Sequence, residues 1–300
     1  MAELGRLLTS MITPFDDEGE VDYQQARRLA QALVGSGSDG VVVAGTTGEA
    51  PTLTRDEQTQ LFAEVRDAVG DKGTVVAGTG SNSTEEAVTY TKDAEGAGVD
   101  AVLLVVPYYN KPTQEGLYQH FKATAESTNL PCILYNVPGR TAVNMSSETT
   151  VRLSHVPNIV GIKESSTNFE QVATIIEESS DGFLVWSGND ADTFPIMCMG
   201  GYGVVAVASH IIGRQFKAMM QMLLDGRVKG AAAEHRRLLP MMSGVFTITN
   251  PIPIRYLLEK AGFKVGKPRL PLTGPDGKTA EFLDGLLARY EVDLPVESPA

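Results

Sequence analysis

The chain has 300 residues, a hydrophobic content of 42% and a formal net charge of -12 at pH 7. This acidity argues against nucleic acid or a membrane surface as a partner, because both normally require a basic face. No apolar run approaches the ~18 residues of a membrane span, and no signal peptide is visible. Two cysteines in unrelated segments and four scattered histidines indicate neither a disulfide framework nor a metal site. These features predict a cytoplasmic enzyme without a bound metal.

Eight short apolar runs recur along the chain, and each is followed by a helix-like segment. The runs are rich in Val and Ile and almost continuously apolar, which is typical of strands buried on both faces of a parallel sheet. They are Leu7–Phe15, Gly40–Gly45, Thr74–Gly80, Ala101–Pro107, Cys132–Pro138, Ile159–Glu164, Phe183–Gly188 and Gly203–Ser209.

Helix signals lie between and after these runs. Capping boxes at Thr54–Glu57 and Ser83–Glu86 predict two helix starts. Eight strand–helix units match a (β/α)8 TIM barrel better than an open doubly wound sheet. We therefore predict a catalytic barrel over residues 1–225 and a C-terminal helical extension over residues 226–300. The other predicted helices are Gln215–Leu224, Ala231–Leu239, Ile252–Ala261 and Ala280–Tyr290.

Polar residues gather where the predicted strands end, and the active site of such a barrel forms at the carboxyl ends of its strands. The second strand ends in the sequence GTTGE, in which the hydroxyls of Thr46 and Thr47 lie beside accessible backbone amides. This arrangement suits a carboxylate, and a plain turn into the next helix is the alternative. Arg140 follows the fifth strand behind a Pro-Gly pair, and its planar fork suits bidentate carboxylate binding.

Lys163 is the only one of the eleven lysines inside an apolar strand-like run. Burial disfavours the ammonium form, so such a lysine can act as an amine nucleophile and form a Schiff base with a carbonyl substrate. The alternative is a snorkelling lysine or one paired with Glu164. Tyr135 ends the neighbouring strand, where its hydroxyl could transfer protons, although an aromatic residue there could also be core filler. Together with Arg140 and the threonine hydroxyls, these residues indicate Schiff-base chemistry on a keto acid.

Several motifs in this order resemble the dihydrodipicolinate synthase branch of the pyruvate-dependent class I aldolases, from about Leu7 to Leu272. They are GTTGE at Gly45–Glu49, PYYNKP at Pro107–Pro112, YNVPGRT at Tyr135–Thr141, GIKE at Gly161–Glu164, NPIP at Asn250–Pro253 and RLPL at Arg269–Leu272.

The resemblance implies a role for each matching position. Lys163 would condense with pyruvate without any cofactor, and Thr46 and Thr47 would hold the pyruvate carboxylate. Tyr135, Thr46 and Tyr109 would form a proton relay, with Tyr109 reaching in from a neighbouring subunit of a homotetramer. Backbone groups of Gly188 and Val205 would line the pyruvate site.

The second substrate implied by the resemblance is L-aspartate-4-semialdehyde, whose carboxylate Arg140 would bind. The position of Arg140 is typically not arginine in the N-acetylneuraminate lyase and keto-deoxy-sugar-acid branches, which remain the alternative. A non-catalytic barrel is a third possibility, and it would be expected to lack Lys163 or Tyr135.

An effector site is also implied. Family members inhibited by lysine resemble this chain at Asn82, Glu86 and Tyr108. They often carry histidines where this chain has Arg55 and Gln58, so inhibition by lysine does not follow from the resemblance.

Overall fold

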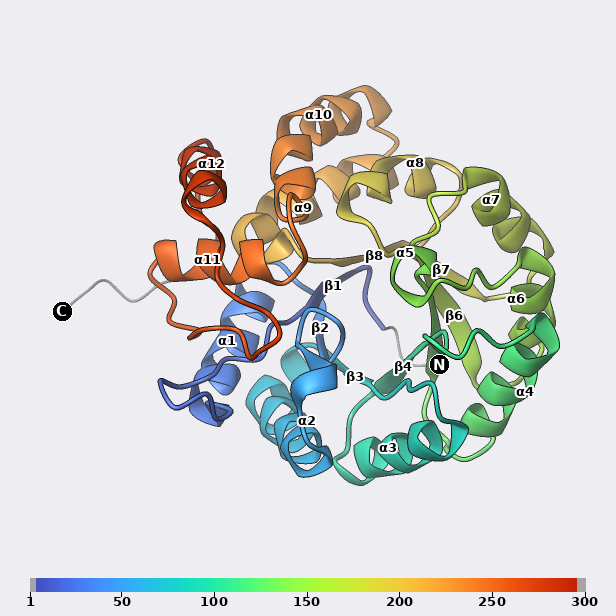
Figure 1. The fold of residues 1–300 in the computed structure, drawn as a ribbon. Helices are drawn as coiled ribbons and strands as arrows, with labels where there is room; N and C mark the ends of the chain where they lie inside the picture. Colours follow the sequence, from blue (N-terminus) through green and yellow to red (C-terminus); the bar gives the residue numbers. More distant parts are fainter. Residues whose placement is uncertain (1–3, 296–300) are drawn as a thin grey trace.

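The computed structural model describes residues 4–295. Its eight parallel strands are hydrogen-bonded in chain order, and β8 pairs with β1 to close a barrel, as Figure 1 shows. The predicted (β/α)8 barrel is therefore confirmed. The strands are β1 (Leu7–Ser10), β2 (Gly40–Val43), β3 (Thr74–Gly78), β4 (Ala101–Val105), β5 (Cys132–Asn136), β6 (Ile159–Glu164), β7 (Leu184–Ser187) and β8 (Gly203–Ala206).

Every predicted apolar run contains one of these strands, but several runs extend beyond the strand. The first run was predicted to end at Phe15, whereas β1 ends at Ser10. The residues after Ser10 remain buried, and Met11, Ile12 and Phe15 belong to the hydrophobic core. An apolar pattern reports burial and not hydrogen bonding to a neighbouring strand, so it cannot locate the end of a strand.

Helices surround the barrel and cover the outer face of its sheet (Figure 1). The capping box at Thr54 is complete, because its side chain accepts from Glu57 N–H and the Glu57 side chain accepts from Thr54 N–H. The second predicted box is half formed: Ser83 caps its helix, while the Glu86 carboxylate accepts from the Ser81 hydroxyl at 2.7 Å. The helices of the barrel are α1 (Tyr23–Gly35), α2 (Arg55–Val69), α3 (Thr84–Gly96), α4 (Gln114–Ala125), α5 (Pro138–Thr141), α6 (Ser147–Ser154), α7 (Phe169–Glu178), α8 (Thr193–Cys198) and α9 (Ser209–Leu224), with 3-10 turns η1 (Ala50–Thr52), η2 (Gly70–Lys72) and η3 (Asp190–Asp192).

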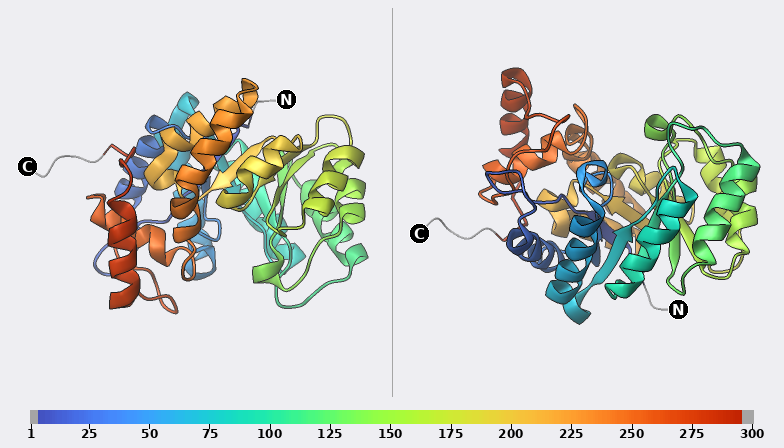
Figure 2. Two further views of the ribbon diagram at one scale, coloured as in Figure 1. Left: turned by 90° about the horizontal axis from the view of Figure 1, so that it is seen from above. Right: turned by 60° about the horizontal axis from the view of Figure 1, so that its bottom comes forward.

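Three further helices, α10 (Val228–Gly244), α11 (Ile252–Lys260) and α12 (Gly277–Leu287), follow the eight units. Figure 2 shows these orange and red helices gathered on one side of the barrel. The helix predicted at Gln215 begins earlier, at Ser209, and its helical geometry is interrupted at Ile212. Residues 296–300 of the predicted extension lie outside the described residues.

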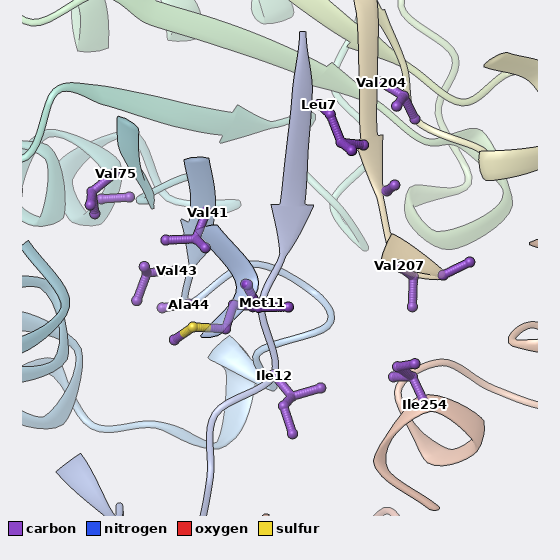
Figure 3. Close-up of a cluster of buried hydrophobic side chains, with 14 of the residues drawn as sticks. Leu7, Met11, Ile12, Val41, Val43, Ala44, Val75, Val204, Val207 and Ile254 are labelled. Atoms are coloured by element: carbon purple, nitrogen blue, oxygen red, sulfur yellow. The ribbon is translucent and has the colours of Figure 1, made fainter. Parts of the chain in front are cut away.

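Two buried clusters make up the core. A small inner cluster takes residues from the strands, including Val42, Ile133, Tyr135, Trp186 and Val205, and fills the barrel. A larger cluster lies between the strands and the helices, and part of it appears in Figure 3, where Ile254 of α11 faces the β1 and β8 region. The C-terminal helices thus share one continuous apolar core with the barrel, which fixes them relative to the strand ends.

Within residues 4–295, no helix is long and apolar enough to cross a membrane. The same part of the chain contains no group of three or more His, Cys, Asp or Glu side chains placed to hold a metal ion.

Candidate active site

Lys163 lies near the carboxyl end of β6 and is 5% exposed. Its partners across the sheet are Tyr135 on β5 and Trp186 on β7, and both belong to the cluster inside the barrel. Lys163 Nζ lies 4.2 Å from the centroid of the Tyr135 ring. The sheet therefore directs an amine and a phenol into the same interior space.

Glu164 does not pair with Lys163, because successive side chains of a strand point to opposite faces of the sheet. Its buried carboxyl accepts hydrogen bonds from the side chains of Asn136 and Gln171, each at 3.1 Å, and from Ser166 N–H at 2.7 Å. Burial raises the pKa of Glu164, and these donors act in the opposite direction. The alternative of a lysine paired with its neighbour is therefore wrong.

Asp190 follows β7 and is buried, with 1% of its surface exposed. Its carboxyl accepts from Val207 N–H at 3.0 Å and from Ala208 N–H at 2.6 Å, at the point where β8 leads into α9. Burial raises the pKa of Asp190 to about 6, while these two donors and the charge of Lys163 act in the opposite direction. Asp190 thus anchors the segment that follows Val205.

The GTTGE loop after β2 is held by residues from the C-terminal extension. Asn250 Nδ2 donates to Thr47 Oγ1 at 2.9 Å, and Arg255 forms a buried ion pair with Glu49 at 2.6 Å. Burial lowers the pKa of Arg255, and Glu49 offsets this effect. Glu49 also has a left-handed backbone, with φ of 56°, which costs about 1–3 kcal/mol in a non-glycine residue and requires support from its surroundings.

Arg140 lies on α5, the short helix after β5, and is exposed. Its Nη2 donates to the backbone carbonyl of Asn250 at 3.2 Å. Asn250 therefore links two sites that were predicted separately: its side chain contacts the threonine loop, and its carbonyl contacts the arginine.

A cavity of about 400 Å³ opens at this end of the barrel. Thr46, Tyr135 and Arg140 line it, together with Glu86 and Tyr108 from the predicted effector site. Lys163 and Val205, which lie within β6 and β8, do not line this cavity, and neither do Thr47 and Gly188, which follow β2 and β7. The cavity thus brings two of the predicted catalytic residues, Thr46 and Tyr135, together with two of the predicted effector residues within one chain.

Gly188 lies at the end of β7 against Lys163. A Cβ at this position would collide with Ser165 Oγ and stand 3.0 Å from Lys163 Cγ, so the close approach requires glycine. Val205 lies in β8 at 1% exposure within the inner cluster. Both residues border the interior of the barrel, as a role in lining the pyruvate site would require.

Tyr109 is not brought into this site within the chain. Its side chain is 89% exposed, and its backbone is left-handed with φ of 72°. Tyr108, in contrast, is 37% exposed and lines the cavity. An aromatic side chain held outward in a strained backbone conformation is available to a second subunit.

The third predicted effector residue, Asn82, and the two positions that depart from the inhibited pattern, Gln58 and Arg55, have different surroundings. Asn82 contributes its backbone carbonyl, which accepts from Asn110 Nδ2 at 2.8 Å. Gln58 lines the cavity and donates to the carbonyl of Ala50 at 3.3 Å. Arg55 is an exposed residue whose guanidinium pairs with Asp93 at 2.5 Å.

Three contributors were missed by sequence reasoning: Asn250, the Glu49–Arg255 pair and Asp190. Asn250 and Thr47 are 203 residues apart in the chain, so no local pattern connects them. The motif NPIP marked the segment but assigned no function to its asparagine.

The fold and the site define a (β/α)8-barrel enzyme in which a buried lysine lies beside a tyrosine at the strand ends. Residues 3–288 match the model of the Dihydrodipicolinate synthetase family. The chain belongs to that family.

Named relatives support the assignment. The chain is 57% identical over 297 residues to 4-hydroxy-tetrahydrodipicolinate synthase of Dehalococcoides mccartyi, which covers 99% of this chain and 100% of the relative. A dihydrodipicolinate synthase structure from Cyanidioschyzon merolae with lysine bound is 45% identical, with a TM-score of 0.94, and the match covers 95% of this chain and 98% of that one. A monomeric dihydrodipicolinate synthase variant is 40% identical, with a TM-score of 0.93, and covers 95% and 96% of the two chains.

Proposed function

We propose that this chain is a 4-hydroxy-tetrahydrodipicolinate synthase, a lyase that condenses pyruvate with L-aspartate-4-semialdehyde in diaminopimelate and lysine biosynthesis. The observation that carries the proposal is the placement of Lys163 Nζ 4.2 Å from the Tyr135 ring at the ends of adjacent strands. The reaction needs no cofactor, because the imine that the lysine amine forms with pyruvate itself accepts electrons when the methyl group loses a proton.

In the first half of the reaction, the hydroxyls and amides of the Thr46–Thr47 loop hold the pyruvate carboxylate. Lys163 Nζ attacks C2 of pyruvate, and the carbinolamine loses water to give an imine. Loss of a proton from the pyruvate methyl group then gives an enamine. Tyr135 is the residue that transfers these protons, since its phenol lies beside the amine.

In the second half, the enamine carbon forms a bond to the aldehyde carbon of the semialdehyde. The amino group of that substrate then attacks the imine carbon, which closes the ring and releases Lys163. Arg140, exposed at the cavity, binds the carboxylate of the semialdehyde through its guanidinium. Gly188 and Val205 contribute backbone groups around the pyruvate.

The proton relay includes Thr46 and, from a neighbouring subunit, Tyr109. The exposure of Tyr109 supports an assembly in which the residue is covered by a partner. We propose a homotetramer built from tight dimers. A cytoplasmic location remains the expectation from the sequence.

The alternative is a related aldolase that acts on a sugar acid. It is less well supported, because Arg140 lines the cavity and is positioned by Asn250. Regulation by lysine at Asn82, Glu86 and Tyr108 also stays a proposal, because Arg55 and Gln58 occupy positions where inhibited family members often carry histidines. Arg55 is in addition paired with Asp93.

Two measurements test the proposed function. The protein is incubated with pyruvate and borohydride, and we expect the reduced adduct on Lys163 and on no other lysine. Turnover of pyruvate with L-aspartate-4-semialdehyde is measured in parallel, with Lys163→Ala as the control. An adduct on another lysine, or cleavage of a sugar acid in preference to this condensation, would contradict the proposal.

A further inference from the structure

Ser165 carries a buried hydroxyl with no hydrogen-bond partner among residues 4–295. An unpaired polar atom in a protein interior is destabilising, so its persistence calls for an explanation. Ser179 Oγ is a second buried serine hydroxyl in the same condition, but it lies at the end of α7. Ser165, in contrast, follows β6 two residues after Lys163.

The surroundings of Gly188 show where the Ser165 hydroxyl points. A single Cβ on Gly188 would meet both Ser165 Oγ and Lys163 Cγ, so the two side chains border the same point on the neighbouring strand end. Residues two apart on a strand face the same side of the sheet, which agrees with this contact. Because Ser165 is nearer the carboxyl end of the barrel, its hydroxyl lies on the mouth side of the lysine.

We propose that Ser165 is a further catalytic residue, whose hydroxyl donates a hydrogen bond to the aldehyde oxygen of the second substrate. This inference rests on the proposed Schiff-base function. As the enamine carbon bonds to the aldehyde carbon, the electrons of the carbonyl double bond move to its oxygen. That oxygen becomes an alkoxide, which receives its proton from the Tyr135 relay and ends as the hydroxyl of the product.

The position of Ser165 favours a role in the bond formation with the aldehyde over a role in the earlier formation of the imine with pyruvate. In the proposed reaction pyruvate is bonded to Lys163 deep in the barrel and the aldehyde enters from the mouth, and Ser165 follows Lys163 in the direction of that mouth. A donor aimed at developing negative charge acts most strongly in a buried site, because it need not reorganise during the reaction. Serine can donate one hydrogen bond and needs no change of charge to do so.

The test is the Ser165→Ala variant, with Ser179→Ala as the matched control. We expect Ser165→Ala to lower kcat and kcat/KM for the semialdehyde together, by roughly 10- to 100-fold, as for an interaction made in the transition state. Borohydride trapping of pyruvate on Lys163 should be unchanged. Ser179→Ala should leave both measurements unchanged.

Thermal unfolding separates this role from a structural one. Removing an unpaired buried hydroxyl should leave the melting temperature of Ser165→Ala equal to or above that of the wild type. The inference would be overturned if the semialdehyde kinetics of Ser165→Ala were unchanged, or if only pyruvate adduct formation were lost. It would also be overturned if a lowered melting temperature accounted for the lost activity, or if Ser179→Ala lost as much activity.

The Ser165→Cys variant provides a second test, because a thiol is a weaker donor of similar size. We expect its turnover to lie between those of the wild type and the alanine variant. If the wild type itself forms no pyruvate adduct, the proposed function fails. If the wild type is active and both Ser165 variants match it, only the role of Ser165 fails.

Discussion

Lys163 and Tyr135 are direct partners across β6 and β5, and the lysine amine lies 4.2 Å from the centroid of the phenol ring. The pairing is set by the register of two parallel strands and not by a loop. A site built on strands holds its reacting groups more accurately than one built on loops. In the proposed reaction, this register keeps the amine of Lys163 and the phenol of Tyr135 aligned through several steps.

The Tyr135→Phe variant tests the proton transfer. The ring keeps its packing in the inner cluster and only the hydroxyl is lost, so the fold should survive. We expect turnover to fall by a factor on the order of 10²–10⁴, the usual contribution of a positioned acid or base. Steady-state kinetics on a variant with wild-type circular dichroism provides the measurement. Near-normal turnover would assign the proton to another group.

The Arg140→Ala variant tests substrate choice. Loss of a charge-assisted pair with the semialdehyde carboxylate should cost ~2–4 kcal/mol of transition-state binding. We expect a raised KM or lowered kcat for the semialdehyde, with pyruvate adduct formation at Lys163 retained. Equal weakening of both substrates would mean that Arg140 only braces the loop after β5. Unchanged semialdehyde parameters would favour the sugar-acid aldolase.

The Asn250→Ala variant separates the two contacts of this residue. The substitution removes the 2.9 Å hydrogen bond to Thr47 but keeps the backbone carbonyl that accepts from Arg140. We expect KM for pyruvate to rise by about 3- to 10-fold, the worth of one hydrogen bond, with a smaller effect on the semialdehyde. Steady-state kinetics with each substrate varied in turn gives the KM of the variant for pyruvate and for the semialdehyde. A larger effect on the semialdehyde would show that the contact with Arg140 dominates.

The contribution of Tyr109 across subunits can be tested by mixing two impaired variants. Tyr109→Phe and Lys163→Ala should each have low activity alone. In a mixed dimer, the site that retains Lys163 can receive an intact Tyr109 from the other subunit, so activity should return after the variants are unfolded and refolded together. Tyr135→Phe mixed with Lys163→Ala is the control and should not recover. Failure of the first pair to recover, or a fully active monomer, would refute the shared relay.

His210 should make the protein acid-sensitive. The residue is fully buried: Nδ1 lies 2.8 Å from the Val207 carbonyl, and Nε2 accepts from Ile12 N–H at 3.3 Å. Burial lowers the pKa of His210 from 6.5 to about 4. The unfolded chain therefore binds more protons in this window, and the stability due to neutral His210 is lost as pH falls from about 6.5 toward 4.

By pH 5 this loss should reach about 2 kcal/mol in the free energy of unfolding. We expect His210→Gln to be less stable than the wild type at pH 8 but to lose less on acidification to pH 5, as measured by denaturant titration at each pH. Asp190 has the opposite effect on the pH dependence of stability. Its pKa is raised in the folded protein, so its contribution to the free energy of unfolding falls as pH rises from 3.8 to about 6. If the free energy of unfolding fell equally in both proteins between pH 8 and pH 5, His210 would not be a cause of the acid sensitivity.

The sequence by itself determined the number and order of the strands, because each strand is buried on both faces and shows this as a local apolar run. It also determined the position of Lys163 and Tyr135 at the ends of consecutive strands, since parallel strands bring their carboxyl ends to one edge. Only the tertiary structure decided the contacts between Asn250 and Thr47, between Arg255 and Glu49, and between Gly188 and Ser165. These pairs join segments 23 to 206 residues apart, and their geometry follows from barrel closure and helix packing, which no local periodicity encodes.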